Sequence, residues 1–74
     1  EQRLNNNIIL RKLKIALNLQ NEGVQELLKL AAMDLSKHEL TAFFRRATHK
    51  HYRDCKDQVL RNFLKGMQLK YRKA

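Results

Sequence analysis

Four successive stretches of the chain repeat apolar residues at the spacing of an α-helix, and no proline interrupts any of them. Proline breaks helix interiors because it lacks an N–H group and its ring clashes with the preceding turn. The chain has 74 residues with only two glycines, and it is rich in good helix formers such as Leu, Lys and Arg. The sequence therefore predicts an all-α fold, a compact four-helix domain with short loops.

The apolar stripes place the four helices. We expect a first helix at about residues 7–18 and a second that begins at a cap at Asn21 and ends near residue 32 or 33. A third helix is expected at 37–47 and a fourth at about 55–72, with residues 48–53 as a loop between them. The residues expected to face inward are Ile9, Leu10, Leu13, Ala16, Leu17, Val24, Leu27, Leu28, Ala31, Leu40, Phe43, Phe44, Ala47, Val59, Leu60, Phe63, Leu64, Met67 and Tyr71. We interpret residues 5–74 as one helical domain and residues 1–4 as a residual linker.

The segment 26–46 carries the sharpest local signals. Ser36 and Glu39 have the spacing of a capping box, in which each side chain accepts a hydrogen bond from the backbone N–H of the other. Leu35 and Leu40 flank this cap at the spacing of a hydrophobic staple. Two helices joined by a short turn form a helix-turn-helix-like corner. The sequence thus predicts such a corner, with a third helix that begins just after Ser36.

Two features of the last helix are also predicted. Asp54 is placed as its N-cap, because an Asp side chain at that position can accept from the free backbone N–H groups. Gly66 falls in mid-helix, where glycine costs about 1 kcal/mol relative to alanine. The sequence therefore predicts that another helix approaches closely at Gly66.

The net charge of +9, from 16 basic and 7 acidic residues, favours polyanionic partners. DNA or RNA is the first candidate and an anionic membrane surface the second. We exclude the membrane, because the apolar face of the last helix is needed for the core and no apolar run is long enough to span a bilayer. The candidate nucleic-acid-binding residues are the outward stripe of the third helix and the cations after it: Lys37, His38, Thr41, Arg45, Arg46, Lys50 and Arg53.

A second interpretation stays open, that of a protein-interaction or assembly domain. Ile8, Ile15 and Leu19 broaden the apolar surface of the first helix beyond one stripe. Such a surface suits docking to a sister copy, to the chain itself or to an acidic partner. The turn of the corner also lacks the usual glycine, and bulky Leu30 stands where helix-turn-helix motifs prefer a small residue. Both departures weaken the interpretation as a reader of DNA sequence.

Metal binding and catalysis are not expected. His49, His51 and Cys55, with His38, are residue types that suit zinc, but their spacing matches no standard zinc module. Cys55 is better interpreted as a small buried residue than as a nucleophile. The chain has no glycine-rich phosphate loop and no paired-carboxylate pocket. We therefore expect no cofactor and no enzymatic activity, and the single cysteine fits a reducing, cytoplasmic setting.

Three segments, NNNIILRKLKIALNL, LLKLAAMDLSKHELTAFFRR and HYRDCKDQVLRNFLKGM, together resemble the YehS-like family of small bacterial proteins. The resemblance covers nearly the whole chain. It implies a bacterial, cytoplasmic helical protein of unknown function, in which this chain corresponds to the second of two tandem copies. The chain departs from the family pattern around residues 46–53, which are basic here and tend to be acidic in other copies, and at Lys65, where asparagine is frequent. The resemblance carries over no catalytic residues.

Overall fold

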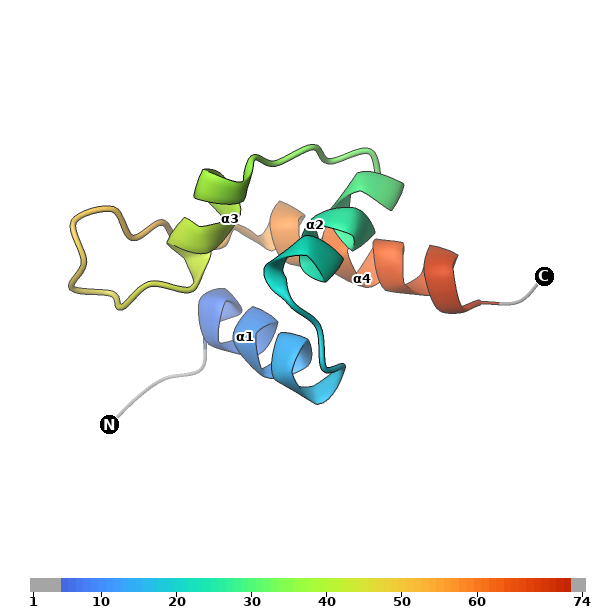
Figure 1. Cartoon of the computed structure of the whole chain (residues 1–74), viewed down its shortest axis with the longest axis horizontal. Coiled ribbons are helices and arrows are strands. Elements are labelled where there is room, and N and C mark those ends of the chain that lie inside the picture. Colours follow the sequence, from blue (N-terminus) through green and yellow to red (C-terminus); the bar gives the residue numbers. More distant parts are fainter. Residues whose placement is uncertain (1–4, 73–74) are drawn as a thin grey trace.

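The computed structural model describes residues 5–72 and contains four α-helices (Figure 1). The helices are α1 (Asn6–Ala16), α2 (Asn21–Leu30), α3 (Lys37–Phe43) and α4 (Asp57–Tyr71). The prediction of an all-α, four-helix fold is confirmed. The expected linker at residues 1–4 and the last two residues of the expected domain lie outside the described part of the chain.

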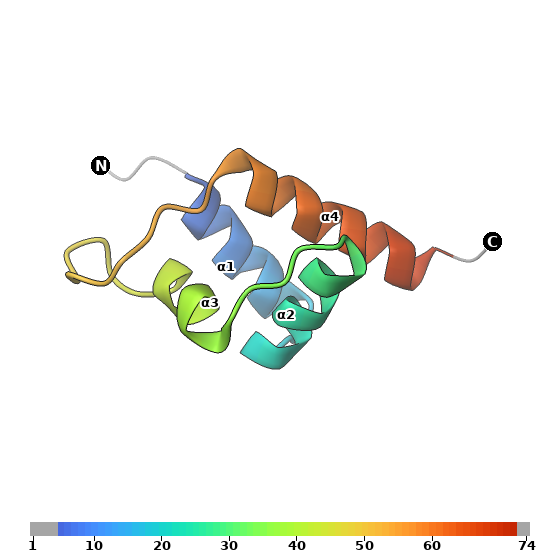
Figure 2. The ribbon, with the colours of Figure 1, turned by 90° about the horizontal axis from the view of Figure 1, so that it is seen from above.

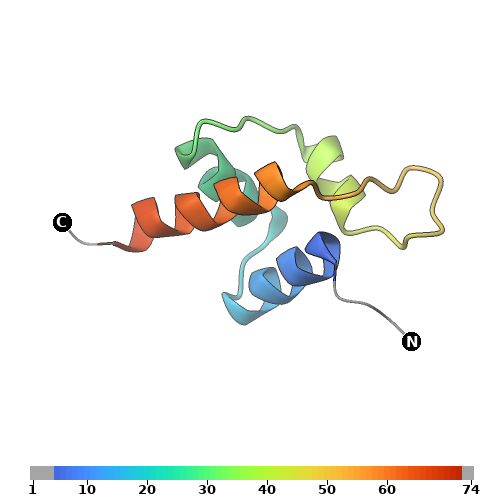
Figure 3. The same ribbon diagram turned by 180° about the vertical axis from the view of Figure 1, so that it is seen from behind.

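The helix pair α2 and α4 forms the centre of the fold. Seen from behind, α4 runs across α2, with α1 on one side of it (Figure 3). The loop between α3 and α4, residues 44–56, lies at the end of the molecule opposite the last turn of α4, beside the start of α1 (Figures 1 and 2). No helix within residues 5–72 is both long and apolar enough to cross a bilayer.

All four helices contribute to one apolar core. Its buried members are Leu10, Val24, Leu27, Leu28, Leu40, Phe43, Cys55, Val59 and Phe63. Each Leu, Val or Phe that folding buries in this way stabilises the domain by about 1.5–3 kcal/mol. Most of the predicted inward positions are confirmed as buried or as packed against this core. The prediction was wrong for Ala16, Ala47, Leu64 and Tyr71, which are exposed.

Gly66 lies where α4 crosses α2. A Cβ atom added there would lie 2.6 Å from the backbone carbonyl carbon of Leu27, and closer still to its oxygen. The two backbones are therefore in direct contact, and only a residue without a side chain fits between them. The prediction of a close approach at Gly66 is confirmed, and the approaching helix is α2.

The start of α3 also agrees with the sequence. Ser36 Oγ accepts from the Glu39 backbone N–H at 3.1 Å, and Glu39 Oε1 accepts from the Ser36 N–H at 3.0 Å. The capping box is thus confirmed. However, the connection from α2 runs over residues 31–36 and is longer than the three- or four-residue turn of a helix-turn-helix. Ala32, the second residue of this connection, has φ of 65°, in the left-handed region that favours glycine.

Several predicted helix ends were wrong. The first two helices end at Ala16 and Leu30, two or three residues earlier than expected. Asn21 is the first residue of α2 rather than its cap, and Gln20 takes the cap position without a side-chain hydrogen bond. The N-cap of α4 is Lys56 rather than Asp54. The third helix ends at Phe43 rather than at Ala47, because its last carbonyl groups are hydrogen-bonded by donors from distant parts of the chain, as described below.

Candidate nucleic-acid interface

Four of the seven predicted site residues share one shallow hollow beside α3. Lys37, His38, Thr41 and Arg45 together line a depression of about 220 Å³. The Thr41 hydroxyl donates to the carbonyl of Lys37 at 2.8 Å, so it is occupied within the helix. The outward stripe expected from the sequence is therefore a continuous surface, although Arg45 follows the helix rather than belonging to it.

Two of the predicted cations are already paired with carboxylates. Lys37 Nζ lies 3.1 Å from Glu22 Oε2, and Arg53 Nη1 lies 3.6 Å from Glu39 Oε2. All four side chains are exposed, and exposed pairs contribute little to stability. The pKa of Glu39 is lowered by hydrogen bonds from the Ser36 backbone and hydroxyl, and to a smaller extent by Arg53. Both cations thus contribute less positive potential than the sequence suggests.

Arg45 is the residue that joins the parts of this surface. Besides the hollow along α3, it borders a depression that also contains His38 and Arg53. It also borders a third hollow, which contains Arg46. Lys50 is exposed on the loop and lines none of these three hollows. The structure therefore gathers five of the other six predicted residues around Arg45 and leaves Lys50 apart.

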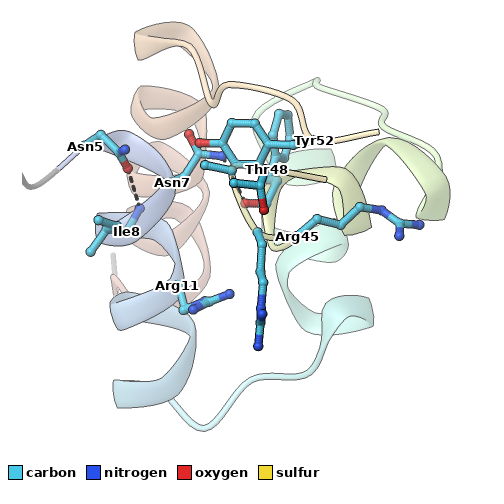
Figure 4. Close-up of a pocket in the computed structure, with 10 residues that line it drawn as sticks. Asn5, Asn7, Ile8, Arg11, Arg45, Thr48 and Tyr52 are labelled. Carbon is cyan, nitrogen blue, oxygen red and sulfur yellow. Dashed lines mark hydrogen bonds between the residues drawn. The ribbon is translucent and has the colours of Figure 1, made fainter. Parts of the chain in front are cut away.

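The hollow that contains Arg46, about 430 Å³ in volume, lies between the start of α1 and the segment that follows α3 (Figure 4). We call it the arginine pocket, and it is lined by Asn5, Asn7, Ile8, Arg11, Phe43, Arg45, Arg46, Ala47, Thr48 and Tyr52. Asn5, Asn7, Ile8 and Arg11 come from one wall, and Arg45, Thr48 and Tyr52 come from the other. None of the residues within 5–72 that line it is acidic.

Arg11 is the site residue that the sequence analysis missed. It extends from α1 toward the opposite wall of the arginine pocket (Figure 4), and its Nη2 donates to the Phe44 carbonyl at 2.8 Å. A signal for it was present in the sequence. Residues 5–21 and residues 40–53 contain no Asp or Glu, and these two acid-free segments form the two walls of the pocket.

Arg45 is held less firmly than Arg11. Its Nη1 lies 3.2 Å from His49 Nε2, while His49 Nδ1 accepts from the His51 backbone N–H at 3.0 Å. A neutral imidazole has only one acceptor nitrogen, so these two hydrogen bonds exclude each other. In addition, the buried Nε–H of Arg45 has no acceptor among residues 5–72. The Arg45 guanidinium therefore has donor capacity that the protein leaves unused.

The asparagines at the start of α1 hold in place the loop 44–56, which forms the opposite wall of the arginine pocket. Asn7 Nδ2 donates to the carbonyl groups of Phe43 and Arg53, at 2.9 and 2.8 Å, and Asn7 Oδ1 accepts from the Cys55 N–H at 2.8 Å. Asn6 Nδ2 donates to the Cys55 carbonyl at 3.0 Å and to Asp57 at 2.7 Å. The two asparagines thus fix both ends of the loop 44–56 to the first turn of α1.

The remaining candidates from the sequence give no cluster. Cys55 is buried, and burial raises the pKa of its thiol to about 11, with a further contribution from Asp57. Burial, followed by the charge of Asp54, also raises the pKa of Tyr52 above its usual value. Within residues 5–72, no three His, Cys, Asp or Glu side chains gather closely enough to hold a metal ion.

Comparison with known proteins identifies the family. A sequence profile of the family described as "Protein of unknown function (DUF1456)" matches residues 6–73. The chain belongs to this family. A relative, the "Uncharacterized protein YehS" of Escherichia coli (strain K12), is 43% identical over 67 residues, which make up 90% of this chain and 43% of that protein. The chain thus spans less than half of the length of this relative. No solved structure matches the chain.

The resemblance to the YehS-like family, expected from the sequence, is therefore confirmed. Neither the DUF1456 description nor the name of the relative assigns a function.

Proposed function

We propose that this chain is a non-enzymatic nucleic-acid-binding module. Its binding surface consists of the hollow beside α3, lined by Lys37, His38, Thr41 and Arg45, and of Arg46, Lys50 and Arg53, which follow in the chain. The observation that carries the proposal is the position of Arg45, which borders three adjoining hollows at once. A chain of phosphates that crosses Arg45 would meet further cations on either side of it.

Binding of this kind is expected to follow the phosphate backbone more than the base sequence. Contacts to phosphate position a protein on nucleic acid, whereas contacts to base edges specify the sequence. A recognition helix enters the major groove with its N-terminal residues on the bases. Here α3 has only seven residues, and Lys37 in its first turn is paired with Glu22. We therefore propose general nucleic-acid binding with little base preference.

The test is an anisotropy titration of the chain with labelled duplex and single-stranded oligonucleotides at two salt concentrations. Affinity should fall steeply with salt, because phosphate contacts release counterions. Lys37→Ala and Arg45→Ala should each weaken binding and reduce the salt slope by about one. Lys65→Ala removes the same charge from the exposed surface of α4 and should have little effect. Absence of binding at low salt would refute the proposal.

We keep as a second proposal a protein-interaction role, in which the chain docks to a sister copy, to itself or to an acidic partner. It is supported by Ile15, whose side chain is 70% exposed on α1. The apolar surface is narrower than the sequence suggests, since Leu19 packs against the core and Ile8 is half-buried. Light scattering tests this proposal. A strictly monomeric chain at all accessible concentrations would contradict docking to a second copy.

A further inference from the structure

We infer that the arginine pocket binds a terminal phosphate monoester, as found at the end of a nucleic-acid strand. This inference rests on the proposed function and names the group that the surface would recognise. It follows from three features of the pocket, namely its charge, the unused hydrogen-bond donors of its arginines and the apolar part of its lining.

The charge of the pocket suits a dianion. Arg11, Arg45 and Arg46 line it, and no acidic residue within 5–72 does. A phosphate within a strand is a diester with a single negative charge, whereas a terminal monoester carries about −1.5 to −2 at pH 7 and has three terminal oxygen atoms. Three guanidinium groups therefore match a terminal phosphate better than an internal one.

The donors of the pocket are partly fixed and largely unused. A guanidinium group has five N–H donors and pairs with two phosphate oxygens at once. Arg11 is anchored through one nitrogen on the Phe44 carbonyl, at 2.8 Å, which leaves its other donors available. Arg45 has a buried Nε–H without an acceptor in the described chain, so a ligand that provides acceptors and lets the side chain rotate slightly would satisfy it.

The start of α1 adds to the same field. The N-terminus of a helix carries a partial positive charge and unpaired N–H groups, both of which favour phosphate. The first turn of α1 contains no acidic residue, and its N-cap, Asn5, lines the pocket. This contribution supports the arginine cluster and would not make a site without it.

The apolar part of the lining favours a nucleotide as the group that carries the phosphate. Phe43, Ile8 and the partly exposed Tyr52 line the pocket together with the arginines. Aromatic side chains stack on nucleobases with little dependence on sequence. The volume of about 430 Å³ lies within the range of about 300–1,000 Å³ typical of small-molecule sites. The hollow along α3 continues from Arg45 and would take the phosphates that follow in the strand.

The experiment compares one single-stranded oligonucleotide with a 5′-phosphate or a 5′-hydroxyl, labelled at its 3′ end, by anisotropy. We expect the phosphorylated strand to bind about fivefold or more tightly, because charge-assisted hydrogen bonds to a dianion are strong. A nucleoside 5′-monophosphate should compete with the labelled strand better than inorganic phosphate does. O-phosphoserine tests whether an amino-acid phosphate serves equally well.

Two pairs of variants locate the effect. Arg46→Ala and Lys50→Ala each remove one charge from the same loop, but only Arg46 lines the pocket. Arg46→Ala should abolish the preference for the 5′-phosphate, whereas Lys50→Ala should weaken both strands equally. Arg11→Ala and Lys12→Ala form the corresponding pair on α1, and Arg11→Lys, which keeps the charge, should retain part of the preference. Thermal melting confirms that each variant is folded.

The outcomes separate this inference from the proposed function. Equal, salt-dependent binding of both strands would overturn the inference and leave the proposed function standing. A preference that persists in both Arg46→Ala and Arg11→Ala would also overturn it. Competition by O-phosphoserine equal to that of the nucleotide would overturn the nucleic-acid end as the ligand. No oligonucleotide binding at low salt, with Arg46-dependent binding of the monophosphate, would contradict both the proposed function and the strand as ligand.

Discussion

Replacing Gly66 by alanine tests the central contact of the fold. The added methyl group would lie 2.6 Å from the Leu27 carbonyl carbon, and the obstacle is backbone, which cannot rotate away as the end of a side chain can. To reach ordinary contact, α2 and α4 have to separate by roughly 1 Å in an interior that is packed as densely as an organic crystal. The strain therefore falls on the helix pair that forms the centre of the fold.

The expected loss is about 2–4 kcal/mol in the free energy of unfolding. Overpacking a core costs about 1–3 kcal/mol. Moving α2 away from α4 also exposes part of the buried surface of Leu27 and Phe63, and the full burial of each side chain stabilises the fold by about 1.5–3 kcal/mol. The higher helix propensity of alanine returns about 1 kcal/mol. A domain of this length has a total stability of about 4–11 kcal/mol. Each kcal/mol corresponds to about 4–8 °C in Tm.

Circular dichroism at 222 nm, followed during heating and in urea, measures the effect. We expect Gly66→Ala to lower Tm by about 10–25 °C, at about 4–8 °C per kcal/mol. The matched control is Gly23→Ala, also within a helix, where the nearest atom to an added Cβ is the flexible Cδ2 of Leu19 at 3.0 Å. That variant should be neutral or up to about 1 kcal/mol more stable. A Gly66→Ala protein as stable as the parent would refute the direct contact between the two backbones.

Four further perturbations follow from named residues. Asn7→Ala should lower the free energy of unfolding by about 2–4 kcal/mol in urea titrations, since it removes three hydrogen bonds and leaves the buried Cys55 N–H without an acceptor. Ala32→Gly should raise it by about 1 kcal/mol, since φ of 65° strains a residue that has a Cβ atom. Because its pKa is about 11, the Cys55 thiol should react with a disulfide reagent at pH 8 at least roughly a hundredfold more slowly in the native protein than in urea. The folded pKa of Glu39 lies below its ordinary value of 4.5, so its contribution to stability is complete above that pH and is lost as the pH falls through the folded value. Glu39→Gln should therefore flatten the dependence of Tm on pH in the acidic range.

Each of these four has a contrary result. An Asn7→Ala variant no less stable than Asn6→Ala, whose bonds lie nearer the surface, would contradict the bridging role of Asn7. A loss of stability in Ala32→Gly would show that the turn does not need the left-handed conformation. Fast labelling of native Cys55 would contradict its burial. An unchanged acid profile in Glu39→Gln would show that the capping box does not hold the carboxylate in its charged form.

Local signals in the sequence predicted those features whose partners lie within a few residues. The capping box joins Ser36 to Glu39, and the apolar stripes reflect the repeat of a single helix. The end of α3 was not predictable in this way. The carbonyl groups of Phe43 and Phe44 accept from Asn7 and Arg11, more than thirty residues away, so they are satisfied without another helical turn.

The same cause explains the start of α4 and the missed site residue. Asp54 has the right chemistry for a cap, but Asn6 and Asn7 hold the backbone of Cys55, and the helix begins only at Asp57. The apolar stripe of the first helix does not include Arg11, which is exposed, but periodicity did not show that the segment after α3 lies opposite that residue. Patterns within one helix specify its faces. The pairing of faces from different helices depends on the tertiary fold.

The hydrogen bonds of Asn6, Asn7 and Arg11 also couple the motion of α1 to that of the loop 44–56. Few backbone contacts join α1 to α4, so α1 depends on these bonds and on its buried Leu10. Any local opening that lifts α1 also releases both ends of the loop and dismantles the arginine pocket. A ligand that bridges Arg11 and Arg46 binds only the closed form, so it lowers the population of this opening by mass action. Ligand binding would then slow amide hydrogen exchange along the whole of α1, also at residues that the ligand does not contact.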